Sequence, residues 1–223
     1  MSLTPAPVAL LFDLDGTLVD TAPDLAGAAN ALRARHDLPP LPYEPLRREV
    51  SEGAGALVTL ALRREATHPD FDAAREQLLS LYGEAVAVSS ALFEGLREVL
   101  DHYRDARRPW GIVTNKPRRF AVALLEALQI EADVLLCADD MAVKKPDPAP
   151  LLEAARQLSV APGRCWYIGD HRRDVEAARA AGMTAIAVRY GYLREGDDPG
   201  RWGADRVVET PTALAALLLQ KNG

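Results

Sequence analysis

The chain has 223 residues, 48% of them hydrophobic and 26% charged, so it is long enough to bury a core as one large domain or two small ones. Its net charge of -6 disfavours nucleic acid and anionic membranes as partners, because both repel an acidic surface. Its two cysteines show no CxxC spacing, and no apolar run reaches the roughly 20 residues of a membrane span. We therefore expect a soluble, cytoplasmic protein without disulfides.

The first predicted strand runs from Ala9 to Asp13. Its continuous apolar character indicates burial on both faces, as in a parallel sheet. Thr21 then predicts the N-cap of a helix, with Asp24 as its capping-box partner. This helix is expected to end near His36, before a Pro-rich stretch.

Residues 17–88 show helical patterns only, and we predict no strand there. Gly53 and Gly55 interrupt the second helical stretch, which predicts two helices that meet at a break. A further helix is expected to start around Asp70.

From about residue 90 the pattern alternates between strands and helices. Strands are predicted at 110–114, 133–137, 165–170, 184–188 and 206–209, and helices at 117–130, 148–160, 172–182 and 210–220. This alternation is typical of a parallel sheet. We predict an α/β fold: a Rossmann-like doubly wound parallel sheet formed by residues 1–16 and 89–223, with an inserted all-helical domain of residues 17–88.

Several predicted strands end in polar residues. Ligands of open parallel sheets bind at the carboxyl ends of the strands, so these residues are candidates for a site. They are Asp13, Asp15, Thr114, Asn115, Asp170 and Asp174, with Lys144 and Lys145 in a Pro-bounded loop. Four carboxylates at one edge repel one another unless a cation neutralises them, and carboxylate oxygens suit Mg²⁺.

Four segments, DLDGTLVDT, VTNK, KKPDP and GDHRRD, resemble in this order the four motifs of the haloacid dehalogenase superfamily of phosphatases. The helical region resembles the cap that this superfamily inserts between its first two motifs. The resemblance covers essentially the whole chain. It implies a Rossmann-like catalytic core, a helical cap domain and a Mg²⁺-dependent phosphomonoesterase.

The resemblance also implies a role for each motif residue. Asp13 would be the nucleophile that forms an aspartyl-phosphate, and Asp15 the acid and then the base. The implied metal ligands are Asp13, the main-chain carbonyl of Asp15, and Asp170, supported by Asp174. Thr114, Asn115 and Lys145 would bind the phosphate, and the motif register selects Lys145 over Lys144.

The segment SEGAGAL resembles the specificity loop of phosphoglycolate phosphatases, and Gly53 and Gly55 would allow close approach of a substrate. Arg47 and Arg48 either form a solvated helix face or meet an anionic substrate group. The stretches LFEG, WGIVTNKP, VRYGYL and WGAD resemble the N-acetylmuramic acid 6-phosphate phosphatases of cell-wall recycling. This resemblance favours that substrate, with phosphoglycolate as the alternative, and a small phosphate ester as the partner of a monomer or homodimer.

Two other classes of function remain open. A phosphomutase on the same fold also keeps an acid at the position of Asp15. A non-enzymatic ligand-binding protein is the third hypothesis, although it predicts a degraded set of motif residues. Dehalogenases of the superfamily are disfavoured, because they lack an aspartate at that position and need no metal.

Overall fold

The computed structural model describes residues 6–220. Its strands are β1 (Ala9–Phe12), β2 (Val19–Asp20), β3 (Ala91–Leu92), β4 (Trp110–Val113), β5 (Val134–Leu136), β6 (Cys165–Gly169), β7 (Thr184–Val188) and β8 (Arg206–Val208). Its α-helices are α1 (Ala22–Arg35), α2 (Tyr43–Glu49), α3 (Ala54–Leu62), α4 (Phe71–Glu84), α5 (Leu96–Asp105), α6 (Arg118–Ala127), α7 (Ala149–Gln157), α8 (Arg172–Ala180) and α9 (Pro211–Leu219). The short 3-10 helix η1 (Val50–Glu52) joins α2 to α3.

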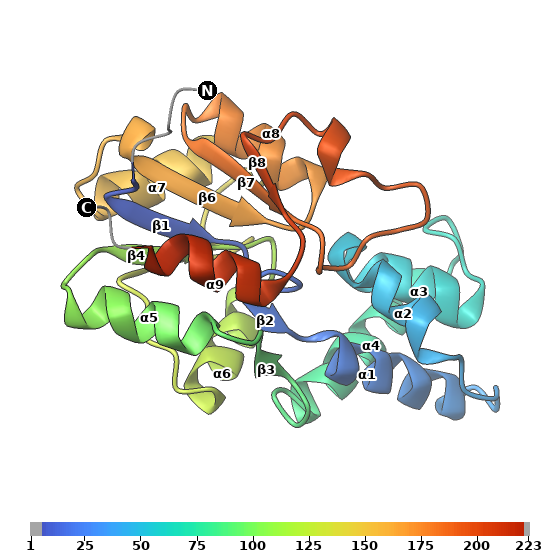
Figure 1. Cartoon of the computed structure of the whole chain (residues 1–223). Helices are drawn as coiled ribbons and strands as arrows, with labels where there is room; N and C mark the ends of the chain where they lie inside the picture. The colour runs from blue at the N-terminus through green and yellow to red at the C-terminus, as the bar shows by residue number, and fades with distance from the viewer. Residues whose placement is uncertain (1–5, 221–223) are drawn as a thin grey trace.

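Six parallel strands form the central sheet, in the order β5-β4-β1-β6-β7-β8 (Figure 1). β1 lies in the middle, where Phe12 pairs with Ile112 of β4 and Ile168 of β6. The carboxyl ends of these three strands therefore lie side by side. The predicted α/β fold with a doubly wound parallel sheet is confirmed.

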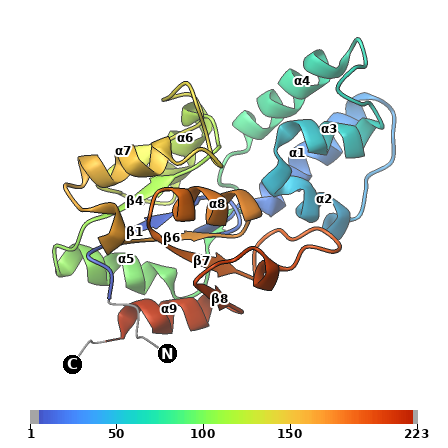
Figure 2. The same ribbon diagram turned by 90° about the horizontal axis from the view of Figure 1, so that it is seen from above.

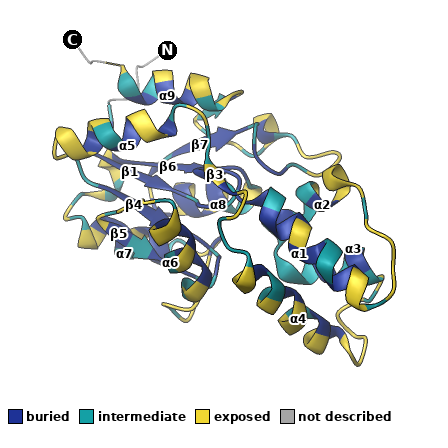
Figure 3. Ribbon diagram, turned by 90° about the horizontal axis from the view of Figure 1, so that it is seen from below, coloured by how far each residue is buried: buried dark blue, intermediate teal, exposed yellow. Residues whose placement is uncertain are grey.

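Alternate residues of each strand enter two separate cores. Leu10 and Phe12 face one core, which α5, α6 and α9 complete, whereas Ala9 and Leu11 face the other, which α7 and α8 complete. Figure 3 shows the strands buried and the exposed residues on the outer surfaces of the helices. Burial on both faces explains why these strands read as continuous apolar runs.

The helices α1–α4 lie together beyond the carboxyl ends of the strands (Figures 1 and 2). They share a third core, to which Phe120 and Tyr192 of the sheet part contribute. Val50 and Leu57 belong to this core on either side of Gly53, where the predicted break between two helices is found. The predicted domain bounds include residues 1–5 and 221–223, which lie outside the described residues. No helix within residues 6–220 is both long and apolar enough to cross a bilayer.

Two features of the chain path differ from the sequence prediction. β2 lies inside the region predicted to be purely helical, and it pairs antiparallel with β3. Two-residue strands are too short to show an alternating pattern. Helix α5 was not predicted either, although Leu96, Val99, Leu100 and Tyr103 are buried at helical spacing.

The start of α1 also differs from the prediction. Thr21 occupies the N-cap position, but its side chain caps no main-chain N–H. The hydroxyl of Tyr192 instead accepts hydrogen bonds from the N–H groups of Thr21 and Ala22, at 2.6 and 2.9 Å. Asp24 is no capping-box partner: its carboxylate accepts bonds from the N–H groups of Ser89 and Ser90 and from the Ser90 hydroxyl. Sequence spacing alone does not reveal such distant partners.

Candidate functional site

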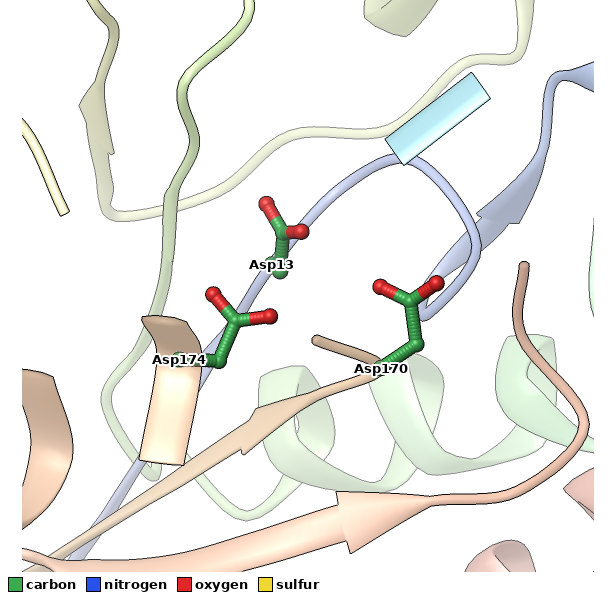
Figure 4. Close-up of side chains that lie close together, drawn as sticks. All are labelled: Asp13, Asp170 and Asp174. Atoms are coloured by element: carbon green, nitrogen blue, oxygen red, sulfur yellow. The ribbon is translucent and has the colours of Figure 1, made fainter. Parts of the chain in front are cut away.

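Three carboxylates meet at the carboxyl edge of the sheet. Oxygen atoms of Asp13, Asp170 and Asp174 lie within 4.8 Å of one another. Asp13 follows β1, Asp170 follows the neighbouring β6, and Asp174 lies in the first turn of α8 (Figure 4). The adjacency of β1 and β6 therefore brings together two aspartates that are 157 positions apart in the sequence.

Asp170 is fully buried and held from several sides. Its carboxylate accepts hydrogen bonds from the Tyr192 N–H at 2.8 Å, the Ser51 hydroxyl at 3.0 Å and the Thr17 hydroxyl at 3.3 Å. A Cβ at Gly191 would lie 2.2 Å from the Asp170 Cβ, so only glycine fits there. These contacts fix the orientation of the carboxylate.

Lys145 supplies the positive charge at this cluster. Its Nζ lies 2.9 Å from Asp13 Oδ1 and 2.8 Å from Asp174 Oδ1. It also donates to the Tyr167 hydroxyl at 2.7 Å. Lys145 is buried whereas Lys144 is exposed, so the structure places Lys145, the lysine chosen by motif register, against the carboxylates.

Burial perturbs the titration of the cluster. It raises the pKa of Asp13 to about 6, although the Lys145 ammonium opposes the shift. Burial and the negative charges of Asp13 and Asp174 raise the pKa of Asp170 to about 7. Burial alone would lower the pKa of Lys145, but the Asp13 and Asp174 carboxylates outweigh it, and the pKa is raised.

The donor set fits a hard divalent cation. Three carboxylates gather at this edge, and the one ammonium beside them contacts Asp13 and Asp174. Burial and neighbouring negative charges raise the pKa values of Asp13 and Asp170, which a bound cation would counteract. Oxygen ligands at a polar edge are those that Mg²⁺ takes in proteins, usually with water and a substrate phosphate completing its shell. The cluster therefore has the chemistry of a divalent-cation site.

Asp15 turns its side chain away from this cluster. Its Oδ1 accepts hydrogen bonds from the Thr21 hydroxyl at 2.6 Å and from Lys116 Nζ at 2.8 Å. Lys116 is buried, and it was not among the sequence candidates although it closes the segment VTNK. Burial would lower the pKa of Lys116, but the Asp15 carboxylate outweighs this effect, and the pKa is raised.

Thr114 and Asn115 follow β4 at the same edge. Thr114 is buried, and its hydroxyl accepts a hydrogen bond from the Lys116 N–H at 3.1 Å. Asn115 Nδ2 donates to the Lys145 carbonyl at 3.0 Å. Asn115 thus connects this loop to the segment that carries the cluster's lysine.

A cavity of about 690 Å³ opens between the sheet edge and α1–α4. Its lining includes most of the sequence candidates, from both sides: Asp13, Asp15, Thr114, Asn115 and Lys145 from the sheet part, and Gly53 and Gly55 from the helical part. Its size is typical of a site for a small organic molecule.

A sequence model described as a haloacid dehalogenase-like hydrolase matches residues 10–188. The chain belongs to this family. It is 43% identical over 212 residues to an N-acetylmuramic acid 6-phosphate phosphatase of Pseudomonas aeruginosa, covering 94% of each chain. It is also 41% identical over 216 residues to a phosphoglycolate phosphatase of Xanthomonas campestris, covering 93% of this chain and 95% of the relative.

Solved structures show the same fold. A crystal structure described as a predicted phosphoglycolate phosphatase from Haemophilus somnus superposes with a TM-score of 0.82 at 26% identity, covering 94% of this chain and 96% of that one. These relatives are named phosphatases, and this haloacid dehalogenase-like hydrolase is accordingly a phosphatase that acts on phosphorylated substrates.

Arg47 of this hydrolase lies at the junction between helices and sheet. Its guanidinium donates to the carbonyls of Tyr190 at 2.8 Å and Gly191 at 3.0 Å, and it stacks 4.9 Å from the centre of the Tyr192 ring. The hydrogen-bonding capacity of Arg47 is thus directed at the main chain beside Asp170. Arg48 is exposed.

Charged residues also join η1 to α8 across the mouth of the hydrolase cavity. Glu52 lies 2.8 Å from His171 Nε2 and 3.1 Å from Arg173. Glu52 and His171 both line the cavity. Nothing in the sequence positions of Glu52, His171 and Arg173 indicates that they interact, so only the structure shows this contact.

Proposed function

We propose that the chain is a Mg²⁺-dependent phosphomonoesterase that works through an aspartyl-phosphate on Asp13. The observation that carries the proposal is the position of the Asp13 carboxylate, which lines the cavity while Asp170, Asp174 and Lys145 surround it. Phosphoryl transfer needs positioning and charge neutralisation more than covalent machinery, and this arrangement offers both.

Each residue has a defined part in the proposed reaction. Asp13 attacks phosphorus as the ester P–O bond breaks, and the departing alkoxide takes a proton from Asp15. Asp15 then removes a proton from the water that attacks the aspartyl-phosphate, which releases inorganic phosphate and free Asp13. Thr114, Asn115 and Lys145 hold the phosphoryl oxygens.

Mg²⁺ would neutralise charge on the transferring phosphoryl group when bound. Asp13, Asp170 and the main-chain carbonyl of Asp15 would hold it, and Asp174 would lie next to these ligands and stabilise the site. Helices α1–α4 would form the cap domain over the site, with Gly53 and Gly55 next to the substrate. The hydrogen bonds of Arg47 to the main chain support a structural part for this residue at the cap junction.

The favoured substrate is N-acetylmuramic acid 6-phosphate, and phosphoglycolate is the alternative. Support for the first is the 43% identical relative of that name, together with a second from Pseudomonas putida at 40%. The 41% identical phosphoglycolate phosphatase supports the alternative. The free thiols of Cys137 and Cys165 support a cytoplasmic location. The oligomeric state stays a prediction.

The test is phosphate release from N-acetylmuramic acid 6-phosphate, phosphoglycolate and a hexose phosphate, with and without Mg²⁺. We expect Mg²⁺-dependent turnover, the highest kcat/KM on the first substrate, and loss of turnover in Asp13→Asn. Asp105→Asn, at the exposed end of α5, is the matched control and should retain activity. Equal turnover in wild type and Asp13→Asn would refute the mechanism, and a preference for phosphoglycolate would overturn the favoured substrate.

A further inference from the structure

Tyr82 is a buried polar residue whose hydroxyl is unused. It lies on α4 and is 1% exposed, and its hydroxyl donates to no acceptor among residues 6–220. Tyr82 lines the cavity. A hydroxyl buried without a partner costs free energy, so a group that enters the cavity and bonds to it would remove that cost.

Lys116, opposite Tyr82, also has unused hydrogen-bonding capacity. It is 8% exposed, and an ammonium carries three N–H donors. Among residues 6–220, Lys116 Nζ donates to Asp15 Oδ1 at 2.8 Å. The ammonium also lies close enough to the Tyr82 hydroxyl oxygen to oppose the rise that burial causes in the pKa of Tyr82, so at least one of its three donors stays free. Lys116 Nζ lies 4.6 Å from the centre of the Tyr82 ring, so the unused donors of Lys116 and the Tyr82 side chain meet at one place in the cavity wall.

The exposed arginines of the cavity are placed differently. The side chains of Arg75 and Arg119 are 44% and 63% exposed, and both lie close to Glu76. Water competes for their charges, so they discriminate weakly between ligands. Lys116 is shielded from water, and it directly contacts Asp15, the proposed proton donor to the leaving oxygen.

We propose that Lys116 and Tyr82 form a subsite for a carboxylate on the alcohol part of the substrate. This inference rests on the proposed function. A carboxylate has two acceptor oxygens, one for a free Lys116 N–H and one for the Tyr82 hydroxyl. It would also supply a counter-ion to Lys116 when Asp15 turns to the leaving oxygen. The preferred substrates are then phosphomonoesters that carry a carboxylate on the alcohol part, a property that N-acetylmuramic acid 6-phosphate and phosphoglycolate share.

Two matched substrate pairs test the subsite. N-acetylglucosamine 6-phosphate lacks the lactyl carboxylate of N-acetylmuramic acid 6-phosphate, and ethyl phosphate lacks the carboxylate of phosphoglycolate. For the pair that wild type turns over, we expect kcat/KM to favour the carboxylated member by about tenfold or more, the range of hydrogen bonds to a charged group. Tyr82→Phe should reduce this ratio several-fold, mainly by raising KM for the carboxylated member.

Lys116→Met should bring the ratio close to one, and Lys116→Arg should restore part of it. Tyr103→Phe is the matched control, because Tyr103 is also buried with an unpartnered hydroxyl among residues 6–220 but lies on α5, in a core away from the cavity. It should leave the ratio unchanged. If Lys116→Met does not fold or is inactive, Tyr82→Phe decides.

The outcomes separate this inference from the proposed function. A wild type that turns over phosphate esters without favouring the carboxylated members would overturn the subsite alone. An unchanged ratio in Tyr82→Phe would do the same. A wild type that hydrolyses no phosphate ester would overturn the proposed function, and the subsite with it.

Discussion

Ser51 Oγ donates a hydrogen bond of 3.0 Å to Asp170 Oδ2, so a residue of the helical part contacts the acidic cluster of the sheet directly. Ser51 lies on η1, two residues before Gly53, and Asp170 directly follows β6. The state of the cluster and the position of the helices are therefore physically connected through one hydroxyl.

We expect Ser51→Ala to lower the free energy of unfolding by about 1 kcal/mol, because a buried carboxylate loses one of its donors. Urea unfolding of the metal-free protein measures this change. Ser80→Ala removes an exposed hydroxyl on α4 that lies 3.5 Å from Glu84 and should change stability by less than about 0.5 kcal/mol. Equal effects of the two substitutions would show that the contact with Asp170 contributes nothing.

Lys145→Met should be much more damaging than Lys144→Met. Removing the Lys145 ammonium leaves Asp13 and Asp174 buried without a counter-charge, which costs about 3–5 kcal/mol for a buried pair. Lys144 is exposed, and its loss should cost less than about 0.5 kcal/mol. Chemical denaturation of both variants without Mg²⁺ compares them, and a similar loss in each would contradict the assignment of Lys145.

The metal-free protein should lose stability as pH rises from 5 to 8. Asp13 and Asp170 have folded-state pKa values of about 6 and about 7, above the ordinary value of 3.8, so the folded state holds their protons more tightly than the unfolded state. Their contribution to stability is full below about pH 4 and is lost as pH rises through 6 to 7.

Calorimetric Tm values across this pH range, with and without Mg²⁺, check the expectation. Mg²⁺ should raise Tm more at pH 8 than at pH 5, because protons compete with the cation for the carboxylates. Asp170→Asn removes one of the two titrations and should flatten the metal-free profile. A wild-type profile as flat as that of the variant would contradict the prediction.

Arg47→Met should reduce stability by about 1–3 kcal/mol, because it leaves two main-chain carbonyls and the face of Tyr192 without their partner. Arg48→Met, on the exposed face of the same helix, should stay within about 0.5 kcal/mol of wild type. Thermal unfolding of both variants distinguishes a junction residue from a solvated one. If Arg47→Met kept full stability but raised KM for the substrate, Arg47 would be a substrate ligand instead.

The sequence predicts the sheet part well, because buried parallel strands are continuous apolar runs that end in polar residues. Asp13, Thr114 and Asp170 could be placed at one edge from this rule alone. Lys116 was missed because nothing in the local pattern distinguishes a buried lysine from a solvated one, and its partner Asp15 is 101 positions away. Ser51 and Tyr192 were missed for the same reason, since their partners come from distant segments.

The pairing of β2 with β3, and the hydrogen bonds that the N–H groups of Ser89 and Ser90 donate to Asp24, hold the two ends of the helical segment between these strands together. Because the two ends of this segment already lie side by side, the segment does not need the strands of the central sheet to move in order to fit. Its length and shape can change while the sheet and its row of aspartates keep their path. We therefore expect that the helical segment can be exchanged at this neck, between β2 and β3, while the edge of the sheet stays intact.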